Sequence, residues 1–356
     1  MENHSSSETF AVLDLFAGPG GWSEGLTRLG LRDVGIEIDA AACATRAAAG
    51  HATIRADVTT CPTAPFAGRT VGQVHSPVCT PYSGAGKGLG LDDLEHVHQA
   101  VHDLAQGRDT RTHHAASCAD PASILAAEPM RWLYDLRPRW VAMEQVPQVL
   151  PLWRQYAQVL RGWGYSTWTG VLNAADYGTP QTRKRAILIA SRTRPVTAPA
   201  PTHTEHPRGA DLFGESLPGW VSMAGALGWD TGVQVVTRGD RKTSGGNVFC
   251  ADRPSWALTE KTRSWVLRHN SQKNATIRPL SAPAGTLFFG HHLNEVVWTD
   301  GQDKRSITES EAAVLQTFPA DYPWQGARTK RFEQIGNAVP PLLAAHIIAT
   351  TAGLPT

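Results

Sequence analysis

Short apolar runs alternate with amphipathic segments through the amino-terminal half of the chain. The runs rich in strand formers are residues 10–16, 34–38, 53–58, 71–75, 140–143 and 186–190. Residues 22–29 and 40–49 have helical periodicity, and the glycine turn 17–21 joins the first strand to the first helix. Strands that alternate with helices predict a mostly parallel sheet covered on both faces. We therefore expect an α/β fold built on a Rossmann-like, mostly parallel sheet.

Chemically useful side chains stand at the ends of these strands. Glu37, Asp57, Cys79 and Glu144 each lie at or just beyond the carboxyl end of an expected strand. In open parallel sheets, ligands bind beyond the carboxyl ends of the strands. The sequence thus predicts one site to which several strands contribute.

The composition of the chain changes near Arg194. Residues 195–207 are rich in Pro, Thr and His, as is typical of a linker, and the stretch 233–278 lacks the alternation of strands and helices. Basic side chains in that stretch outnumber the three acidic ones, and they are Arg238, Arg241, Lys242, Arg253, Lys261, Arg263, Arg268, Lys273 and Arg278. A solvated charged face and a phosphate-binding surface both fit this imbalance.

The carboxyl-terminal part returns to regular structure. Thr308 and Glu311 have the spacing of a capping box for a helix over 308–315, residues 334–341 predict a turn, and 342–352 predict an apolar helix. We expect a first domain over residues 1–195, a second, smaller domain over 196–304, and a return to the first domain over 305–356.

The overall composition limits the class of protein. The 356 residues include 41% hydrophobic and 18% charged ones, with a formal net charge of +1, as in ordinary soluble globular proteins. The five cysteines are scattered without a C-x-x-C pair, which indicates a reducing cytoplasm rather than a disulfide framework or a zinc ribbon. We expect neither a secretory signal in residues 1–9 nor a membrane span.

The glycine turn suggests a nucleoside without a pyrophosphate. Ser23 stands where a dinucleotide fingerprint has its third glycine, which disfavours a nicotinamide oxidoreductase. Glu37 suits the hydroxyls of a ribose, and Asp57 suits the amino group of an adenine. For each acid taken singly, a helix cap or a solvated loop end fits as well.

Cys79 lies between Pro77 and Pro81, ahead of the glycine-rich stretch 83–88. Lys87 in that stretch would favour a thiolate, and a stiffened loop would present it for attack. From these neighbours alone, Cys79 is either a nucleophile or one of the many cysteines that act as small buried hydrophobes.

A set of ordered motifs resembles those of the DNA cytosine-5 methyltransferases. They are residues 14–21 (DLFAGPGG), 76–83 (SPVCTPYS), 144–146 (EQV), 181–185 (QTRKR) and 336–341 (GNAVPP). The later family patterns are P-P-C-Q-P-F-S, E-N-V, Q-x-R-x-R and G-N-x-V-P-P. The motifs leave free roughly residues 196–300, where the family has its target-recognition domain. The resemblance implies the class I fold of methyltransferases that use S-adenosylmethionine.

The resemblance also implies catalytic roles. Cys79 would add to C6 of cytosine, and Glu144 would serve N3 as a proton donor. Arg185, together with Arg183, would hold O2 of the base and a nearby phosphate. A base stacked in a duplex cannot reach these groups, so the target would be flipped out.

The cofactor implied by the resemblance is S-adenosylmethionine, and no metal is expected. Its contacts would be Phe16, Gly18, Gly20, Glu37, Ile38, Asp57, Asn337 and Val339, although Phe16 and Ile38 fit a plain core role equally well. The catalytic motifs depart from the family pattern at Val78, Thr80 and Gln145. We expect the enzyme to be active, with altered kinetics or target preference.

A segment rich in histidine invites a different hypothesis. His96, His98, His102, His113, His114 and Cys118 include plausible zinc ligands. On a helix over 91–106, however, His98 and His102 share a face that His96 does not join. Exposed histidines are the simpler interpretation.

The expected partner is double-stranded DNA, read by a monomer in the bacterial cytoplasm or nucleoid without membrane contact. A cognate restriction endonuclease is a possible further partner. An RNA cytosine-5 methyltransferase is one alternative, although the size of the second domain favours duplex DNA. A non-catalytic DNA-binding relative is another, although Cys79, Glu144 and Arg185 are intact.

Overall fold

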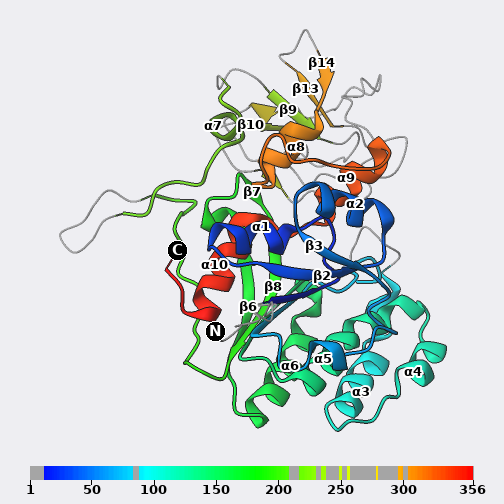
Figure 1. Ribbon diagram of the computed structural model, residues 1–356. Helices are drawn as coiled ribbons and strands as arrows, with labels where there is room; N and C mark the ends of the chain where they lie inside the picture. Colours follow the sequence, from blue (N-terminus) through cyan, green and yellow to red (C-terminus); the bar gives the residue numbers. More distant parts are fainter. Residues whose placement is uncertain are drawn as a thin grey trace, which may run out of the picture.

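The computed structural model of the chain describes residues 12–82, 88–207, 216–229 and 307–355, with the backbone of short strands between residues 234 and 306. A seven-stranded sheet carries helices on both faces, and a smaller sheet lies beyond it at the top of Figure 1. Three features of the sequence lie outside the described residues. These are residues 10–11, the glycine-rich stretch 83–87 and the basic side chains of 233–278.

The large sheet has the strand order β3-β2-β1-β4-β5-β8-β6. Its strands pair in parallel except β8, which is antiparallel to both of its neighbours. The strands are β1 (Val12–Leu15), β2 (Asp33–Glu37), β3 (Ala52–Arg55), β4 (Gly72–His75), β5 (Trp140–Gln145), β6 (Ser166–Asn173) and β8 (Lys184–Ser191). All the predicted strands are present, and β6 is added to them. β6 is the last strand of this sheet, and most of its side chains are half-exposed. Its sequence therefore contains polar residues and lacks the apolar run by which the other strands were predicted.

Helices cover this sheet on both faces, with α3 to α6 below it in Figure 1 and α1 and α10 on the other side. The first group comprises α3 (Leu94–Leu104), α4 (Arg111–Ser117), α5 (Glu128–Leu136) and α6 (Leu150–Gly162). The second comprises α1 (Gly21–Arg28), α2 (Ala40–Ala48) and α10 (Pro341–Ala352). The carboxyl-terminal helix therefore completes the layer begun by the amino-terminal ones.

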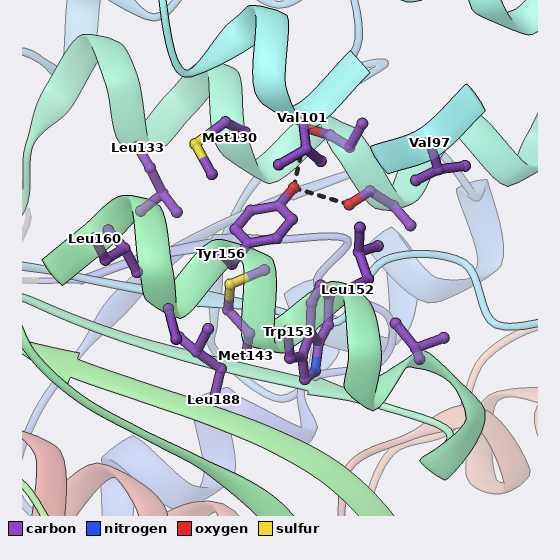
Figure 2. Close-up of a cluster of buried hydrophobic side chains, with 14 of the residues drawn as sticks. Val97, Val101, Met130, Leu133, Met143, Leu152, Trp153, Tyr156, Leu160 and Leu188 are labelled. Atoms are coloured by element: carbon purple, nitrogen blue, oxygen red, sulfur yellow. Dashed lines mark hydrogen bonds between the residues drawn. The ribbon is translucent and has the colours of Figure 1, made fainter. Parts of the chain in front are cut away.

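The larger core lies between the sheet and α3, α5 and α6 (Figure 2). Tyr156 of α6 stands at its centre, and its hydroxyl donates to the carbonyls of Ala126 and Ala127 at 2.8 and 3.0 Å. The indole of Trp153 donates to the carbonyl of Ala186 on β8. The buried polar atoms of these large rings thus have partners, as burial requires.

A buried ionic cluster packs against the glycine turn at residues 17–21. Arg46 of α2 is fully buried and pairs with Asp33 at 2.9 Å and Asp14 at 3.5 Å. Its Nη1 donates to the hydroxyl of Ser23 at 2.8 Å, the residue at the place of the missing third glycine. Gly35 of β2 leaves room for the guanidinium, because a Cβ there would overlap it. Burial raises the pKa of Asp14, and Asp33 is the closer of the two carboxyl groups to the guanidinium.

The smaller sheet has the order β10-β9-β13-β14, and β12 also pairs with β9. Its strands are antiparallel and comprise β9 (Gln234–Thr237), β10 (Val248–Cys250), β12 (Arg278–Pro279), β13 (Val296–Thr299) and β14 (Lys304–Ser306). A separate parallel pair, β7 (Gln181–Thr182) and β11 (Ser255–Trp256), joins this region to the segment that precedes β8.

Three further helices flank the smaller sheet in the sequence. α7 (Met223–Leu227) comes before it, and α8 (Glu309–Leu315) and α9 (Arg328–Asn337) come after it. The capping box of Thr308 and Glu311 is confirmed. The turn predicted over 334–341 is wrong for its first half, because α9 continues to Asn337. The side chains of Gln316 and Arg183 bind the carbonyls of Ile335 and Gly336, and these tertiary contacts stabilise the last turn of the helix.

The stretch Arg328–Ala352 is long and apolar enough, by length and composition, to cross a membrane. It comprises α9 and α10, and 72% of its most apolar window is buried inside the protein. Helices in the core of a globular protein pass the same test, so its apolar character is accounted for by packing against the sheet.

Replacing Arg46 by Met should destabilise the protein by about 3–5 kcal/mol, because Asp33 is left buried without its counter-charge. The free energy of unfolding in urea measures the effect. Arg55→Met, at an exposed arginine on β3, should change that free energy by less than about 0.5 kcal/mol. Equal values for the two variants would show that the cluster does not stabilise the fold.

His75, the last residue of β4, should make the stability depend on pH. It is fully buried, neither ring nitrogen is bonded to a described group, and burial lowers its pKa from 6.5 to about 3. Between those values the unfolded chain binds a proton that the folded chain excludes. The free energy of unfolding should therefore fall by about 1.4 kcal/mol per pH unit as the pH decreases through this window.

Urea unfolding of His75→Leu, between pH 6 and pH 4, tests this dependence. In His75→Leu, the free energy of unfolding should fall less steeply with decreasing pH, by the contribution assigned to His75. In His206→Leu, at an exposed histidine, the pH dependence should equal that of the wild type. Parallel slopes for all three proteins would contradict the assignment.

Candidate active site

One cavity of about 230 Å³ opens at the carboxyl edge of the large sheet. Residues from β2, β5 and the turns after β1 and β4 line it, together with the start of β8 and parts of α1 and α9. The predicted site residues that it brings together are Phe16, Gly18, Glu37, Ile38, Cys79, Glu144, Arg183, Arg185, Asn337 and Val339. All the expected catalytic residues and six of the eight expected cofactor residues thus line one cavity.

Glu144 and Arg185 form an ion pair within this cavity. Glu144 is near the carboxyl end of β5, and Arg185 is near the amino end of the antiparallel strand β8. The Nε of Arg185 lies 2.8 Å from Oε1 of Glu144, and the two side chains are 11% and 7% exposed. At this low exposure the attraction is screened little by water, and it sets the orientation of both groups.

Arg183 has different surroundings from Arg185. It is fully buried, and its Nη1 donates to the carbonyl of Gly336 at 2.9 Å. Burial lowers the pKa of Arg183 to about 9, with a smaller effect from the neighbouring Arg185, so Arg183 remains a cation at neutral pH. It therefore links the sheet to the end of α9 while adding positive charge near Glu144 and Cys79.

Cys79 is half-buried in a loop that three contacts hold in place. The indole of Trp22 donates to the hydroxyl of Ser76 at 2.9 Å. The amide of Gln145 donates to the carbonyl of Pro77 at 2.7 Å, and its oxygen accepts from the backbone N–H of Val146. The carbonyl of Cys79 itself accepts from the N–H of Tyr82 at 3.0 Å. Gln145, a departure from the family pattern, thus ties the strand of Glu144 to the loop of Cys79.

The other end of the cavity is built on Glu37. Its Oε2 accepts from the N–H of Gly18 at 2.8 Å, and its Oε1 accepts from the N–H groups of Ile38 and Asp39. A carboxylate offers about four lone-pair positions, so acceptor capacity remains for a ligand. Phe16 enters the turn at φ 59°, a left-handed conformation that is rare for side chains of its size.

Two of the predicted cofactor residues do not line the cavity. Asp57 is exposed, and its carboxylate accepts from the N–H and the hydroxyl of Thr59 at 2.9 and 2.7 Å. Gly20 belongs to the turn but faces Tyr322 and His51 instead. The contacts of Asp57 and Gly20 with the cofactor stay predictions.

Sequence reasoning missed the wall that α9 contributes. Lys330, Glu333 and Gln334 line the cavity, and the Nζ of Lys330 lies 3.3 Å from Asp39 and 3.1 Å from Glu333. These residues directly precede the recognised motif at 336–341, so the sequence did point to this part of the chain. Because residues 334–341 were interpreted as a turn, the helix that carries Lys330, Glu333 and Gln334 was not predicted.

The histidine-rich segment forms α3, α4 and the turn between them. His98 pairs with Gln155 at 2.6 Å, and His114 lies 3.9 Å from Asp103. Across the part of the chain that the structure describes, no group of three or more His, Cys, Asp or Glu side chains is arranged to hold a metal ion.

Comparisons with known proteins give the same family that the motifs indicate. The family model of the C-5 cytosine-specific DNA methylases matches residues 113–352. The Type II methyltransferase M1.HphI of Haemophilus parahaemolyticus is 25% identical, over 95% of this chain and 86% of its own length. The Type II methyltransferase M.AplI of Arthrospira platensis is 27% identical, over 97% of this chain and 86% of its own length.

Solved structures of methyltransferases share the fold. The Dnmt2 methyltransferase of S. pombe superposes with a TM-score of 0.58 at 14% identity, over 97% of this chain and 98% of that one. The methyltransferase EhMeth of Entamoeba histolytica gives 0.56 at 11% identity, over 98% and 99%. The fold class expected from the sequence is confirmed. Given the family match, this chain belongs to the C-5 cytosine-specific DNA methylases, enzymes that use S-adenosylmethionine as methyl donor.

Proposed function

We propose that this chain methylates C5 of a cytosine flipped out of a specific duplex DNA sequence, through a covalent bond between Cys79 and C6 of the base. The observation that carries the proposal is the single cavity that holds Cys79, Glu144 and Arg185 beside the glycine turn. A base in a duplex could not reach side chains enclosed in this way, so flipping, which costs a few kcal/mol, is part of the proposal.

The residues at the glycine turn fit the cofactor. The carboxylate of Glu37 can accept from ribose hydroxyls, and the uncapped amino end of α1 can bind a carboxylate through its first N–H groups. The exposed side chain of Ile38 offers an apolar surface for a flat base. When bound there, S-adenosylmethionine supplies an electrophilic methyl group on its sulfonium.

The protein's own part begins with the thiolate of Cys79, which adds to C6 while the ring electrons move towards N3. As the base enters, Glu144 takes up a proton from water and gives it to N3, and C5 thereby gains the electron density of an enamine. After C5 carries the methyl group, water takes the C5 proton, the electrons of the C5–H bond form the C5–C6 double bond and expel the Cys79 thiolate, and N3 returns its proton to Glu144. Each group ends the cycle in its starting form.

Arg185 is the arginine that we assign to O2 of the base. Its guanidinium already lies at the cavity, paired with Glu144 at 2.8 Å. A bound cytosine would take over part of this pairing, which frees the carboxyl group for N3 and balances charge on O2. Arg183, which the sequence also assigned to the base, donates to Gly336, so we assign it a positioning role.

The remaining parts of the proposal concern the whole enzyme. We assign residues 1–195 and 305–356 to catalysis and 196–304, with the smaller antiparallel sheet, to target recognition. We propose a monomer that acts in the bacterial cytoplasm, with a cognate restriction endonuclease as a possible partner. The similarity to Type II methyltransferases supports this setting.

Replacing Cys79 by Ser should abolish methylation, on the order of a thousandfold or more, because a hydroxyl is a far weaker nucleophile than a thiolate. Bisulfite sequencing of DNA from cells that express the chain measures this and gives the sequence context. Cys61→Ser, at a half-buried cysteine outside the cavity, should leave methylation intact. Unmethylated DNA in every context, or full methylation by Cys79→Ser, would sink the proposal; methylated cytosines found in RNA alone would support the RNA alternative.

Replacing Gln145 by Leu should lower kcat by about 10- to 100-fold, because the loop of Cys79 loses its bond to β5 and small displacements of a nucleophile are costly. Steady-state kinetics at saturating cofactor and DNA measure kcat. Gln158→Leu, at an exposed glutamine of α6, is the matched control and should match the wild type. An unchanged kcat in Gln145→Leu would show that the bond to Pro77 does not position the nucleophile.

A further inference from the structure

The segment between α8 and α9 packs behind the glycine turn, although the two are far apart in sequence. Tyr322 in this segment is 6% exposed, and its hydroxyl donates to the carbonyl of Pro19 at 2.6 Å. The family motifs quoted above include Pro19 but not Tyr322. The contact therefore connects the turn to a residue for which the proposed mechanism has no role.

The hydrogen bond gives the peptide between Pro19 and Gly20 a second anchor within the turn. The N–H of Gly18 is held by Glu37, and the N–H of Gly20 donates to the carbonyl of Ala17 at 3.2 Å. Gly18 and Gly20 have φ values of 52° and 109°, conformations in which a glycine peptide can rotate at low cost. With its carbonyl bound to Tyr322, the peptide between Pro19 and Gly20 is fixed at both ends.

That peptide lies within the part of the turn that lines the cavity, because Gly18 and Pro19 on one side of it and Gly21 on the other are all lining residues. Gly20 is the N-cap of α1 and makes no side-chain cap, while the next residues, Gly21 and Trp22, line the cavity. The first N–H groups of a helix attract an anion, whereas a carbonyl oxygen rotated towards the same place would repel one. Because Tyr322 holds the Pro19 carbonyl on the side of the turn away from the cavity, the first N–H groups of α1 stay available to the carboxylate of the cofactor.

Tyr322 is itself held rigidly in position. Its ring packs against Phe318 and Trp324 at centroid distances of 4.8 and 4.7 Å. The N–H of Gln325, three residues on, donates to the buried hydroxyl of Thr45 on α2 at 2.9 Å. A Cβ at Gly20 would lie 2.8 Å from the Tyr322 hydroxyl, so tyrosine and turn are in close contact.

We propose that Tyr322 is a positioning residue for S-adenosylmethionine, acting through its bond to the carbonyl of Pro19. The inference rests on the proposed placement of the cofactor's carboxylate at the turn. Tyr322 contributes to cofactor affinity without touching the cofactor or the reacting atoms, which lie with Cys79, Glu144 and Arg185 at the other end of the cavity.

Tyr322→Phe removes the hydroxyl and keeps the ring. Isothermal titration without DNA should show an affinity for S-adenosylmethionine about tenfold weaker than that of the wild type, the equivalent of one hydrogen bond. The KM for the cofactor should rise by the same factor. The kcat at saturating cofactor and the KM for DNA should stay unchanged, a division that a general loss of folding would not produce.

The chain offers a closely matched control in Tyr165. This buried tyrosine also donates its hydroxyl to a proline carbonyl, that of Pro138, at 2.6 Å, but it does not line the cavity. Tyr165→Phe should lose a similar amount of thermal stability while keeping the wild-type affinity for the cofactor. Equal losses of affinity in both variants would overturn the positioning role.

Gly20→Ala gives a second, independent change in the same turn. Because both substitutions disturb one peptide, the double variant should lose less affinity than the product of the two single losses. Wild-type affinity in Tyr322→Phe, or fully multiplicative losses, would overturn the inference and leave the proposed function intact. If the wild type itself failed to bind S-adenosylmethionine, the proposed cofactor site would fall, and the inference with it.

Discussion

The reversed direction of β8 is the constraint that brings Arg185 to Glu144 in the cavity. In a wholly parallel sheet, the strand beside β5 would bring its carboxyl end to the edge where Glu144 lies. Because β8 is antiparallel, its amino end arrives there instead, and the register that pairs Glu144 with Ile187 sets Arg185 within 2.8 Å of the carboxylate. Glu144 and Arg185, the acid and the cation of the proposed mechanism, are thus neighbours before any ligand binds.

The other half of the site depends on the return of the chain after the second sheet. Arg183 binds the carbonyl at the end of α9, Tyr322 binds the carbonyl of Pro19, and Lys330 pairs with Asp39. Each contact joins the last part of the chain to the first or to the sheet. The wall of the cavity is therefore complete only when the two ends of the chain have packed together, which α10 secures by burying its apolar side chains against α1 and the sheet.

The three departures from the family pattern have different structural roles. Gln145, in place of the usual asparagine, uses both ends of its amide, one on Pro77 and one on the backbone of Val146. Val78 and Thr80 line the cavity beside Cys79, where their side chains can contact a group that enters it. The first departure therefore concerns the support of the Cys79 loop, and the other two concern the surroundings of Cys79.

The sequence by itself determined the family, six of the seven strands of the large sheet and the residues to which the proposed mechanism gives roles. Short apolar runs, glycine turns and ordered motifs are local patterns, and local patterns suffice to identify β1, β2, β4, β5, β8 and the residues at their ends. It could not show that Arg183 and Arg185, two residues apart, have different partners, or that Tyr322 supports the glycine turn. Those assignments depend on strand register and on contacts between the two ends of the chain, which only the packed tertiary structure decides.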